Sequence, residues 1–446
     1  MTSRFQALTR MDLRADDAEA RRLWRARCAR AAGLAGDADA DAKRIVDDVR
    51  VRGDVAVAEH TARLEQRTLA PAQFELDAAT RAAAARRVPT AIADALRFAA
   101  ARITAFHRTQ VPVATGLTDA QTTLQSRPTP LRRVAVYAPG GTAAYPSSVL
   151  MAAIPAKVAG VDEVVLFTPR PADVVLLAAE LAGVDRVFQL GGAQAIAAAA
   201  FGTQTVPRVD KIVGPGNAWV TAAKRQVFGV CDIDGIAGPS EILVIADGSA
   251  DPVIVAADLI SQAEHDPLAC AVLVTDSPSL IDAVDGALQG QLTNLPRSEI
   301  AQASLVDHGA AVLVADRDAM VVAANDYAPE HLELLVESPW ALVPALRTAG
   351  AIFVGPHTPE AAGDYTAGPS HVLPTAGAAR FGSPLGVSDF TKITSVIQLS
   401  GAALTEQAQA ITTLARAEGL EGHARAVELR LPSPRTQRTT LTPQSR

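Results

Sequence analysis

Residues 252–275 read PVIVAADLISQAEHDPLACAVLVT, and this stretch decides the fold class of the chain. Its first nine residues are mostly apolar and favour a helix, Pro267 ends that helix, and its last seven residues have the composition of a buried strand. Gln262 and His265 lie three residues apart in the last turn of the predicted helix, so their side chains share one face. The negative end of the helix dipole favours a cation there. An amide oxygen and an imidazole are half of a metal site, although one such histidine is by itself more often structural.

The same alternation of strands and helices extends on both sides of this stretch. Towards the N-terminus, strands are predicted at residues 133–137, 163–168, 186–190 and 211–213, with helices between them. Gly-rich loops follow three of these strands, at residues 139–142, 191–194 and 214–217. A second alternating set spans residues 242–354. This pattern predicts parallel sheets with helices on both faces, and in such sheets ligands bind where these loops lie. None of the loops has the GxGxxG pattern of a dinucleotide site.

The segments outside the two alternating sets are predicted from composition and periodicity. Residues 1–130 are expected to be mainly helical, with a polar connection at residues 111–130. Residues 304–306 are predicted to be extended, and residues 388–430 to be helical. The final stretch, 431–446, is polar and contains proline without apolar periodicity, so it is expected to be a flexible tail.

Composition excludes several classes of protein. The 446 residues carry a net charge of −7 without a basic stripe, so nucleic acid is not an expected partner. No apolar run reaches the ~18 residues that a membrane span needs, and the charged N-terminus lacks the apolar core of a secretory signal. The cysteines, Cys28, Cys231 and Cys270, form no CxxC pair, which suits a reducing cytoplasm. The chain is therefore expected to be a cytoplasmic enzyme.

Three more acid–imidazole groups could take part in chemistry. Glu330 and His331 follow Pro329, which predicts the first turn of a helix, and such a pair can divide the roles of base and acid. Asp364 lies before a Gly-flanked histidine, and Glu418 lies before His423. Each pattern alone also occurs as a charged helix turn or a surface loop. Together they predict a metal-assisted enzyme, and they leave hydrolysis, aldol chemistry and hydride transfer open.

Read together, eight segments resemble the histidinol dehydrogenase family in content and order, over about residues 30–430. These segments are YAPGGTAAYPSSVLMAAIPAKVAG, QLGGAQAIAAAAFGT, VDKIVGPGN, DGIAGPSEILVIAD, DLISQAEHD, NDYAPEHLE, GDYTAGPSHVLPT and EGLEGHARAVELR. The resemblance implies oxidation of L-histidinol to L-histidine through the aldehyde, the last step of histidine biosynthesis. It also implies one Zn²⁺ per subunit and two NAD⁺ as hydride acceptors.

The resemblance implies roles for particular residues. The implied catalytic acid–base pair is Glu330 and His331, and at a helix start Glu330 should stay ionised and ready to act as a base. The implied zinc ligands are Gln262, His265, Asp364 and His423, the last coming from the other subunit of a homodimer. The implied substrate contacts are Ser240, Gln262, His265, His331, Asp364, Glu418 and His423, and the implied NAD contacts are Tyr137, Gln194 and Asn217.

The resemblance also implies a division of the α/β chain into two incomplete Rossmann-like domains with small helical terminal pieces. The expected boundaries are an N-terminal arm at 1–28, a split first domain at 29–135 and 243–386 that carries the metal site, a second domain at 136–242 on the NAD side, a dimerisation piece at 387–430 and a tail at 431–446.

Alternatives to this function remain at this point. Relatives with the same site oxidise other small alcohols, such as dihydroxypropanesulfonate; Glu418 favours histidinol, because an acid pairs with a cationic amine whereas a sulfonate would need Arg or Lys. A zinc-dependent hydrolase or a non-catalytic metal-binding module could carry the same ligands. A cysteine nucleophile could serve the second oxidation, with Cys231 and Cys270 as the candidates, although both cysteines are predicted to be inert.

Overall fold

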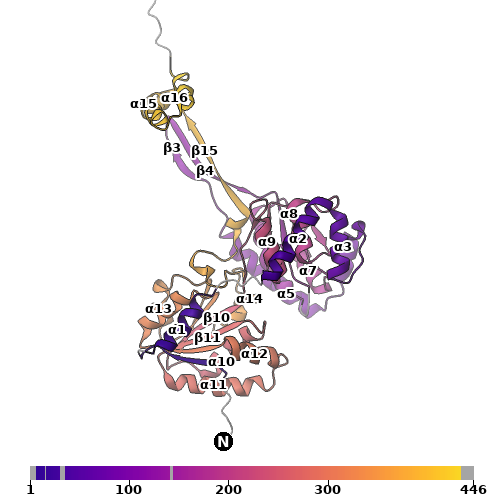
Figure 1. Cartoon of the computed structure of the whole chain (residues 1–446), viewed down its shortest axis with the longest axis vertical. Coiled ribbons are helices and arrows are strands. Elements are labelled where there is room, and N and C mark those ends of the chain that lie inside the picture. The colour runs from indigo at the N-terminus through magenta and orange to yellow at the C-terminus, as the bar shows by residue number, and fades with distance from the viewer. Residues whose placement is uncertain (1–6, 16, 31–35, 141–143, 433–446) are drawn as a thin grey trace, which may run out of the picture. The chain divides into compact units, whose positions relative to one another are not determined.

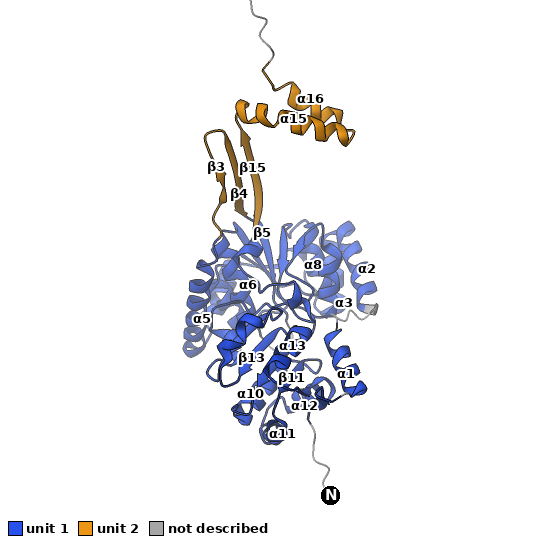
Figure 2. Cartoon of the chain, turned by 90° about the vertical axis from the view of Figure 1, so that its left-hand side faces the viewer, with its two compact units in different colours: residues 1–111, 130–390 blue, residues 112–129, 391–446 orange. Residues whose placement is uncertain are grey.

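The computed structural model describes residues 7–15, 17–30, 36–140 and 144–432, which form two compact units (Figures 1 and 2). Residues 1–111 and 130–390 make unit 1, and residues 112–129 and 391–446 make unit 2. Unit 1 contains two six-stranded sheets with helices on both faces. The predicted α/β class with parallel sheets is therefore confirmed.

The first sheet has the order β1-β12-β11-β10-β13-β14 and is parallel throughout. Its strands are β1 (Thr9–Asp12), β12 (Ala310–Leu313), β11 (Cys270–Thr275), β10 (Glu241–Ala246), β13 (His331–Leu335) and β14 (Ala351–Val354). Alternate residues of β10 face opposite cores, so every residue of this central strand is buried. One face is covered by α10 (Pro252–Ala263), α11 (Pro278–Leu292) and α12 (Ser298–His308), and the other by α1 (Ala18–Cys28) and α13 (Arg317–Tyr327).

The second sheet has the order β2-β7-β6-β5-β8-β9, and all its pairs are parallel except β2–β7. Its strands are β2 (Glu75–Leu76), β7 (Arg186–Phe188), β6 (Glu163–Phe167), β5 (Arg133–Tyr137), β8 (Lys211–Val213) and β9 (Asp232–Ile233). One face packs on α4 (Ala78–Ala85), α5 (Thr90–Arg108), α6 (Pro146–Ala159) and α7 (Asp173–Leu181). The other packs on α2 (Gly36–Arg52), α3 (Asp54–Leu64), α8 (Gly192–Phe201) and α9 (Ala218–Val227).

Two expected domain boundaries are wrong in the structure. Residues 29–135 were assigned to the domain of the metal site, but α2–α5 pack on the second sheet because their apolar faces join its two cores. Residues 1–28 were expected to be a separate arm, but β1 pairs with β12, and Trp24 of α1 stacks on Tyr327 with ring centroids 5.7 Å apart. The described part of this segment is thus an integral edge of the first sheet.

Unit 2 consists of a three-stranded sheet and two helices. The sheet has the order β15-β4-β3, with β15 (Thr391–Leu399), β4 (Thr122–Pro130) and β3 (Thr115–Thr118), and the helices are α15 (Gly401–Ala417) and α16 (Glu421–Glu428). The prediction of helix at 388–430 is therefore confirmed for α15 and α16 and wrong for β15, and the connection predicted at 111–130 contains β3 and β4. β3 and β4 pair with each other locally as an antiparallel hairpin, whereas β15 finds its partner β4 far away in the sequence, which no local pattern records. Most of the predicted tail, 433–446, lies outside the described residues.

Two smaller differences occur in the first sheet. Residues 304–306 belong to α12 and are not extended. Glu330 and His331 stand at the start of β13, where a first helical turn was predicted.

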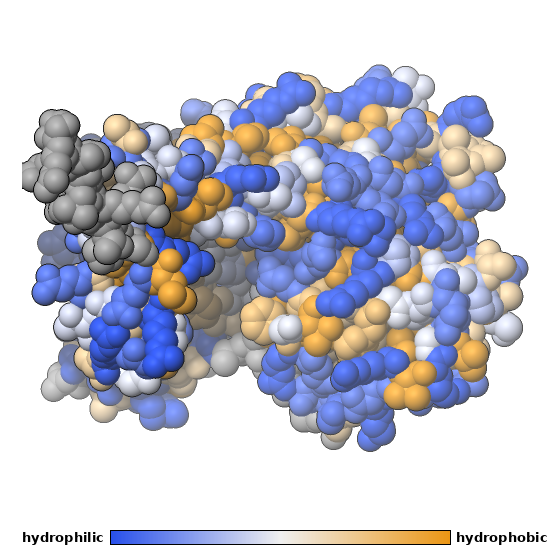
Figure 3. Space-filling view, turned by 90° about the horizontal axis from the view of Figure 1, so that it is seen from above, coloured by the Kyte–Doolittle hydropathy of each residue, from blue (hydrophilic) through white to orange (hydrophobic). Residues whose placement is uncertain are grey.

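On the face seen in Figure 3, hydrophilic residues predominate and apolar residues appear in small groups. Within the described ranges, no helix is both long and apolar enough to span a bilayer.

Candidate active site

The site begins at the C-terminal end of α10. Asp251 caps the start of this helix by accepting a hydrogen bond from Val253 N at 2.8 Å, and Pro252 occupies its first turn. At the other end, Gln262 is completely buried, yet neither its Oε1 nor its Nε2 has a hydrogen-bond partner among the described residues. An amide buried in this way is costly unless something bound there pairs with it.

His265 lies one turn further along, beside a carboxylate from a distant segment. Its Nε2 is 3.8 Å from Oδ2 of Asp364, which belongs to α14 (Glu360–Tyr365). The same carboxylate is approached by His371, whose Nδ1 is 3.7 Å from Oδ1 and donates to the Asp364 carbonyl at 3.0 Å. The structure therefore brings His265 and Asp364 together, as predicted, and adds His371 to the group.

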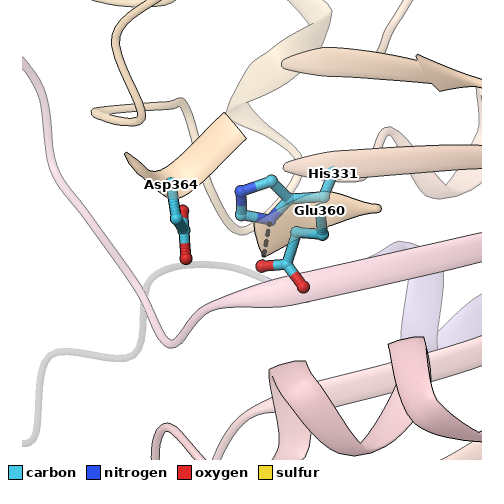
Figure 4. A group of neighbouring side chains, drawn as sticks. All are labelled: His331, Glu360 and Asp364. Atoms are coloured by element: carbon cyan, nitrogen blue, oxygen red, sulfur yellow. Dashed lines mark ion pairs between the residues drawn. The ribbon is translucent and has the colours of Figure 1, made fainter. Parts of the chain in front are cut away.

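The short helix α14 contributes a second acid. Glu360 is 2% exposed, and its Oε2 accepts a hydrogen bond of 3.0 Å from Ser261 Oγ at the end of α10. Ligand atoms of Glu360, Asp364 and His331 all lie within 4.8 Å of one another (Figure 4). Burial, with the nearby Asp364 carboxylate, raises the pKa of Glu360 to about 8. Glu360 was not predicted, although its position four residues before Asp364 places both acids on one helical face and could have identified it.

Glu330 and His331 are both held by the backbone of Glu241, the first residue of the neighbouring strand β10. Oε2 of Glu330 accepts from Glu241 N at 2.8 Å, and Nδ1 of His331 donates to Glu241 O at 2.9 Å. The second bond fixes the proton of the neutral imidazole on Nδ1, which leaves Nε2 as the basic atom. Burial lowers the pKa of His331 to about 4, so the ring is neutral at pH 7.

The carboxyl group of Glu330 does not behave as predicted. It was expected to stay ionised at a helix start, but it is buried at the start of a strand, and burial raises its pKa well above the ordinary value. The hydrogen bond from Glu241 N opposes this effect, whereas the charges of Glu241, Glu360 and Asp364 add to it. Burial therefore favours the protonated form of this carboxyl, and a divalent ion bound nearby would favour the ionised form.

The predicted NAD contacts lie at the C-terminal edge of the second sheet. Tyr137 ends β5, and its hydroxyl accepts a 3.1 Å hydrogen bond from Gly192 N. Gln194, in the first turn of α8, donates to Glu65 Oε1 at 3.1 Å, while its own Oε1 is buried and lacks a partner within the described chain. Asn217 follows β8 and caps α9 by accepting from Val220 N at 3.1 Å. The first two therefore meet around Gly192, whereas the Asn217 side chain caps its own helix.

The remaining predicted residues fall into two groups. Ser240 directly precedes Glu241, and its carbonyl accepts from Cys270 N at 3.0 Å, so it lies at the same strand ends as Glu330 and His331. Glu418 ends α15 and His423 lies in α16, both exposed, and both belong to unit 2. The structure places Glu418 and His423 with respect to the other residues of unit 2 only.

The donor set of unit 1 fits a divalent metal ion. It offers imidazoles, carboxylate oxygens and a buried amide oxygen without a partner, which together suit zinc. Oε1 of Glu360 is also buried and unpaired in the part of the chain that the structure describes. A bound cation would satisfy these oxygens and reduce the repulsion between the acids.

Comparisons with known proteins identify relatives of this chain. Residues 29–431 match the family model described as "Histidinol dehydrogenase". The chain is 52% identical over 402 residues to the histidinol dehydrogenase of Rhizobium meliloti (strain 1021), covering 89% of this chain and 92% of that protein. It is 52% identical over 392 residues to that of Syntrophotalea carbinolica, covering 87% and 91% of the two chains.

A solved structure extends this agreement to three dimensions. The crystal structure of histidinol dehydrogenase from Elizabethkingia anophelis matches with a TM-score of 0.89 at 32% identity, over 96% of this chain and 98% of that one. Sequence and fold thus agree over nearly the whole length, and this chain belongs to the histidinol dehydrogenase family of oxidoreductases.

Proposed function

We propose that this protein oxidises L-histidinol to L-histidine through the aldehyde, with NAD⁺ as the hydride acceptor in both steps. Membership of the family supports the substrate. The observation that carries the proposal is the group of His265, Asp364 and His331 beside the unpaired amide of Gln262. Such a set can hold one cation next to a neutral imidazole base.

The proposed zinc ligands in this subunit are Gln262, His265 and Asp364. A zinc ion, when bound, would hold the imidazole and the neutral amine of the substrate and so fix the carbinol carbon for hydride transfer. Tyr137, Gln194 and Asn217 are the proposed NAD contacts, and the unpaired Oε1 of Gln194 supports this role. Ser240 is proposed to contact the substrate.

His331 is the proposed base of the first oxidation. Its Nδ1 is occupied by the bond to Glu241 O, so Nε2 accepts the hydroxyl proton as the carbinol hydrogen leaves as hydride. Glu330 in its carboxylate form takes a proton from the water that attacks the aldehyde. The hydrated aldehyde then loses a second hydride, and histidine is the product.

A thiol route for the second oxidation has little support. Burial raises the pKa of Cys231 to about 12, and burial also raises that of Cys270. Since the thiolate is the nucleophile, both groups are almost fully in their unreactive form at pH 7.

The test is NADH formation from histidinol by zinc-loaded protein, with and without a chelator. The expected result is two NADH per histidine and loss of the signal on chelation. Dihydroxypropanesulfonate in place of histidinol tests the related alcohol substrate, and hydrolysis without NAD⁺ would identify a zinc hydrolase. A flat trace with fully metallated protein would refute the dehydrogenase.

We also propose that the protein is a cytoplasmic homodimer in which Glu418 and His423 complete the site of the other subunit. Mixing inactive Gln262→Ala and His423→Ala chains tests this idea. If His423 acts across subunits, one site of each mixed dimer is intact, and random pairing restores about a quarter of wild-type activity. If it acts within its own chain, every site stays defective and no activity returns.

A further inference from the structure

We propose that Arg30 and Glu241 form a positioning device that holds Glu330 and His331 in their reactive orientations. This inference rests on the proposed function and extends it to residues that do not touch the substrate. Its starting point is the double use of Glu241, whose backbone serves both catalytic side chains. The N–H binds Glu330 at 2.8 Å and the C=O binds His331 at 2.9 Å.

Glu241 is the first residue of β10, and the regular pairing of this strand with β13 begins one residue later. The register pairs Ile242 with His331, so Glu241 lies just before the first paired position of β10 on that side. Its N–H and C=O are bonded to the side chains of residues 330 and 331 in place of backbone groups. A shift of the Glu241 backbone would therefore move the side chains of Glu330 and His331 together.

The side chain of Glu241 is anchored by a buried guanidinium from outside the sheet. Nε and Nη2 of Arg30 each bind one carboxylate oxygen at 2.5 Å, which is the two-pronged geometry in which Arg is specific and Lys is not. The two side chains are only 15% and 2% exposed. Ala376 N adds a third hydrogen bond to Glu241 Oε1 at 3.1 Å.

Arg30 is in turn fixed by Tyr327. Its guanidinium carbon lies 3.5 Å from the centre of the Tyr327 ring, and its Nη1 donates to the Tyr327 carbonyl at 2.8 Å. The Tyr327 ring also stacks on the Trp24 ring, and both residues belong to the core of the first sheet. Catalytic geometry is thus linked through Glu241 and Arg30 to a rigid aromatic core.

Arg30→Met removes the anchor and keeps a side chain of similar length. We expect kcat for histidinol to fall at least about tenfold while KM stays within about threefold, because substrate and zinc ligands are untouched. Arg30→Lys keeps the charge but loses the two-pronged guanidinium, so its kcat should lie between that of Arg30→Met and that of wild type. Glu241→Gln keeps the backbone contacts but weakens the anchor, and should resemble Arg30→Lys.

The matched control is Arg317→Met, which breaks an ion pair at the opposite end of the same strand. There Arg317 Nη2 lies 3.0 Å from Oδ2 of Asp247, the residue after β10. This control should leave kcat within about twofold of wild type. An equal loss of kcat in Arg317→Met would mean that any broken ion pair on β10 has this effect, and would overturn the proposal.

A readout independent of turnover is the tautomer of His331, measured by ¹⁵N NMR of histidine-labelled protein and assigned with His331→Gln. Wild type should show the Nδ1–H form alone, and Arg30→Met should show both forms. Retained kcat together with an unchanged tautomer in folded Arg30→Lys and Glu241→Gln would refute the device, even if Arg30→Met does not fold. If wild type itself forms no NADH, the proposed function fails, while the tautomer still tests the positioning.

Discussion

From the buried amide of Gln262 we predict how Gln262→Met changes the free energy of unfolding. The sign of this change depends on whether zinc is bound. Its Oε1 and Nε2 are both buried, and neither has a partner in the described part of the chain. An unsatisfied buried polar group costs about 1–3 kcal/mol, so two such atoms cost roughly 2–6 kcal/mol before any relaxation. Gln262→Met replaces the amide by an apolar side chain of the same length. In the metal-free state, this variant should be more stable than wild type by about 2 kcal/mol or more.

Zinc should reverse this order by stabilising the wild type. A ligand at 100 times its dissociation constant stabilises the folded state by about 2.7 kcal/mol, and a variant that lacks one zinc ligand should gain much less. The assay is urea unfolding of chelator-treated protein, with and without added ZnCl₂, at one fixed protein concentration. The free energy of unfolding is compared between wild type and variant in each condition.

Gln226→Met is the matched control, because the same substitution there removes a satisfied amide. Nε2 of Gln226 donates to the Asp39 carbonyl at 2.9 Å and to Asp39 Oδ1 at 3.2 Å. This variant should be destabilised by about 1 kcal/mol and should respond to zinc as wild type does. If Gln262→Met destabilises the metal-free protein as Gln226→Met does, or if zinc stabilises it as much as wild type, the assignment of Gln262 as a zinc ligand is wrong.

Three further predictions concern buried acids and thiols. Burial, with the neighbouring Asp258 carboxylate, raises the pKa of Glu333 to about 10, so the folded protein keeps a proton that the unfolded chain releases above its ordinary pKa of 4.5. Glu333 should therefore make the free energy of unfolding fall by about 1.4 kcal/mol per pH unit between these values. In urea unfolding at pH 6 and 8, Glu333→Gln should make the slope less steep by this amount, while other buried acids such as Glu360 keep their own contribution; equal slopes in both proteins would contradict it. Glu330→Gln should slow oxidation of added histidinaldehyde by about 100-fold or more, and more than that of histidinol, as followed by NADH; equal slowing would argue against a role in activating water. Replacing Cys231 and Cys270 together by Ala should leave turnover within about twofold, and loss of the aldehyde step alone would restore the thiol route.

The catalytic pair shows where local sequence patterns stop being informative. Pro329 before Glu330 and His331 favoured a helix start. In the structure the segment from His331 is a strand instead, because it pairs with β10 on one side and with β14 on the other. The error also concerns the expected charge of Glu330, because burial raises its pKa and opposes its ionisation. A pKa depends on what surrounds the group in space, and the acids near Glu330 come from residues 241, 360 and 364.

His265 and Asp364 are 99 positions apart in the sequence, and their proximity is a tertiary property. The structure joins His265, Asp364 and His331 in unit 1, and it adds Glu360, which only its spacing from Asp364 could have suggested. Glu418 and His423 lie in the other unit, so their role remains a proposal.

The sequence by itself determined the class of the fold. Runs of buried strand residues that alternate with helices allow little besides parallel sheets, and this information is local to each run. Only the tertiary structure decided that β1 joins the first sheet, that α2–α5 cover the second, and that β15 is a strand. These outcomes depend on which distant segment supplies the partner for a hydrogen-bonding edge or an apolar face. Burial, and with it the charge state of the catalytic groups, follows from the same choice of partners.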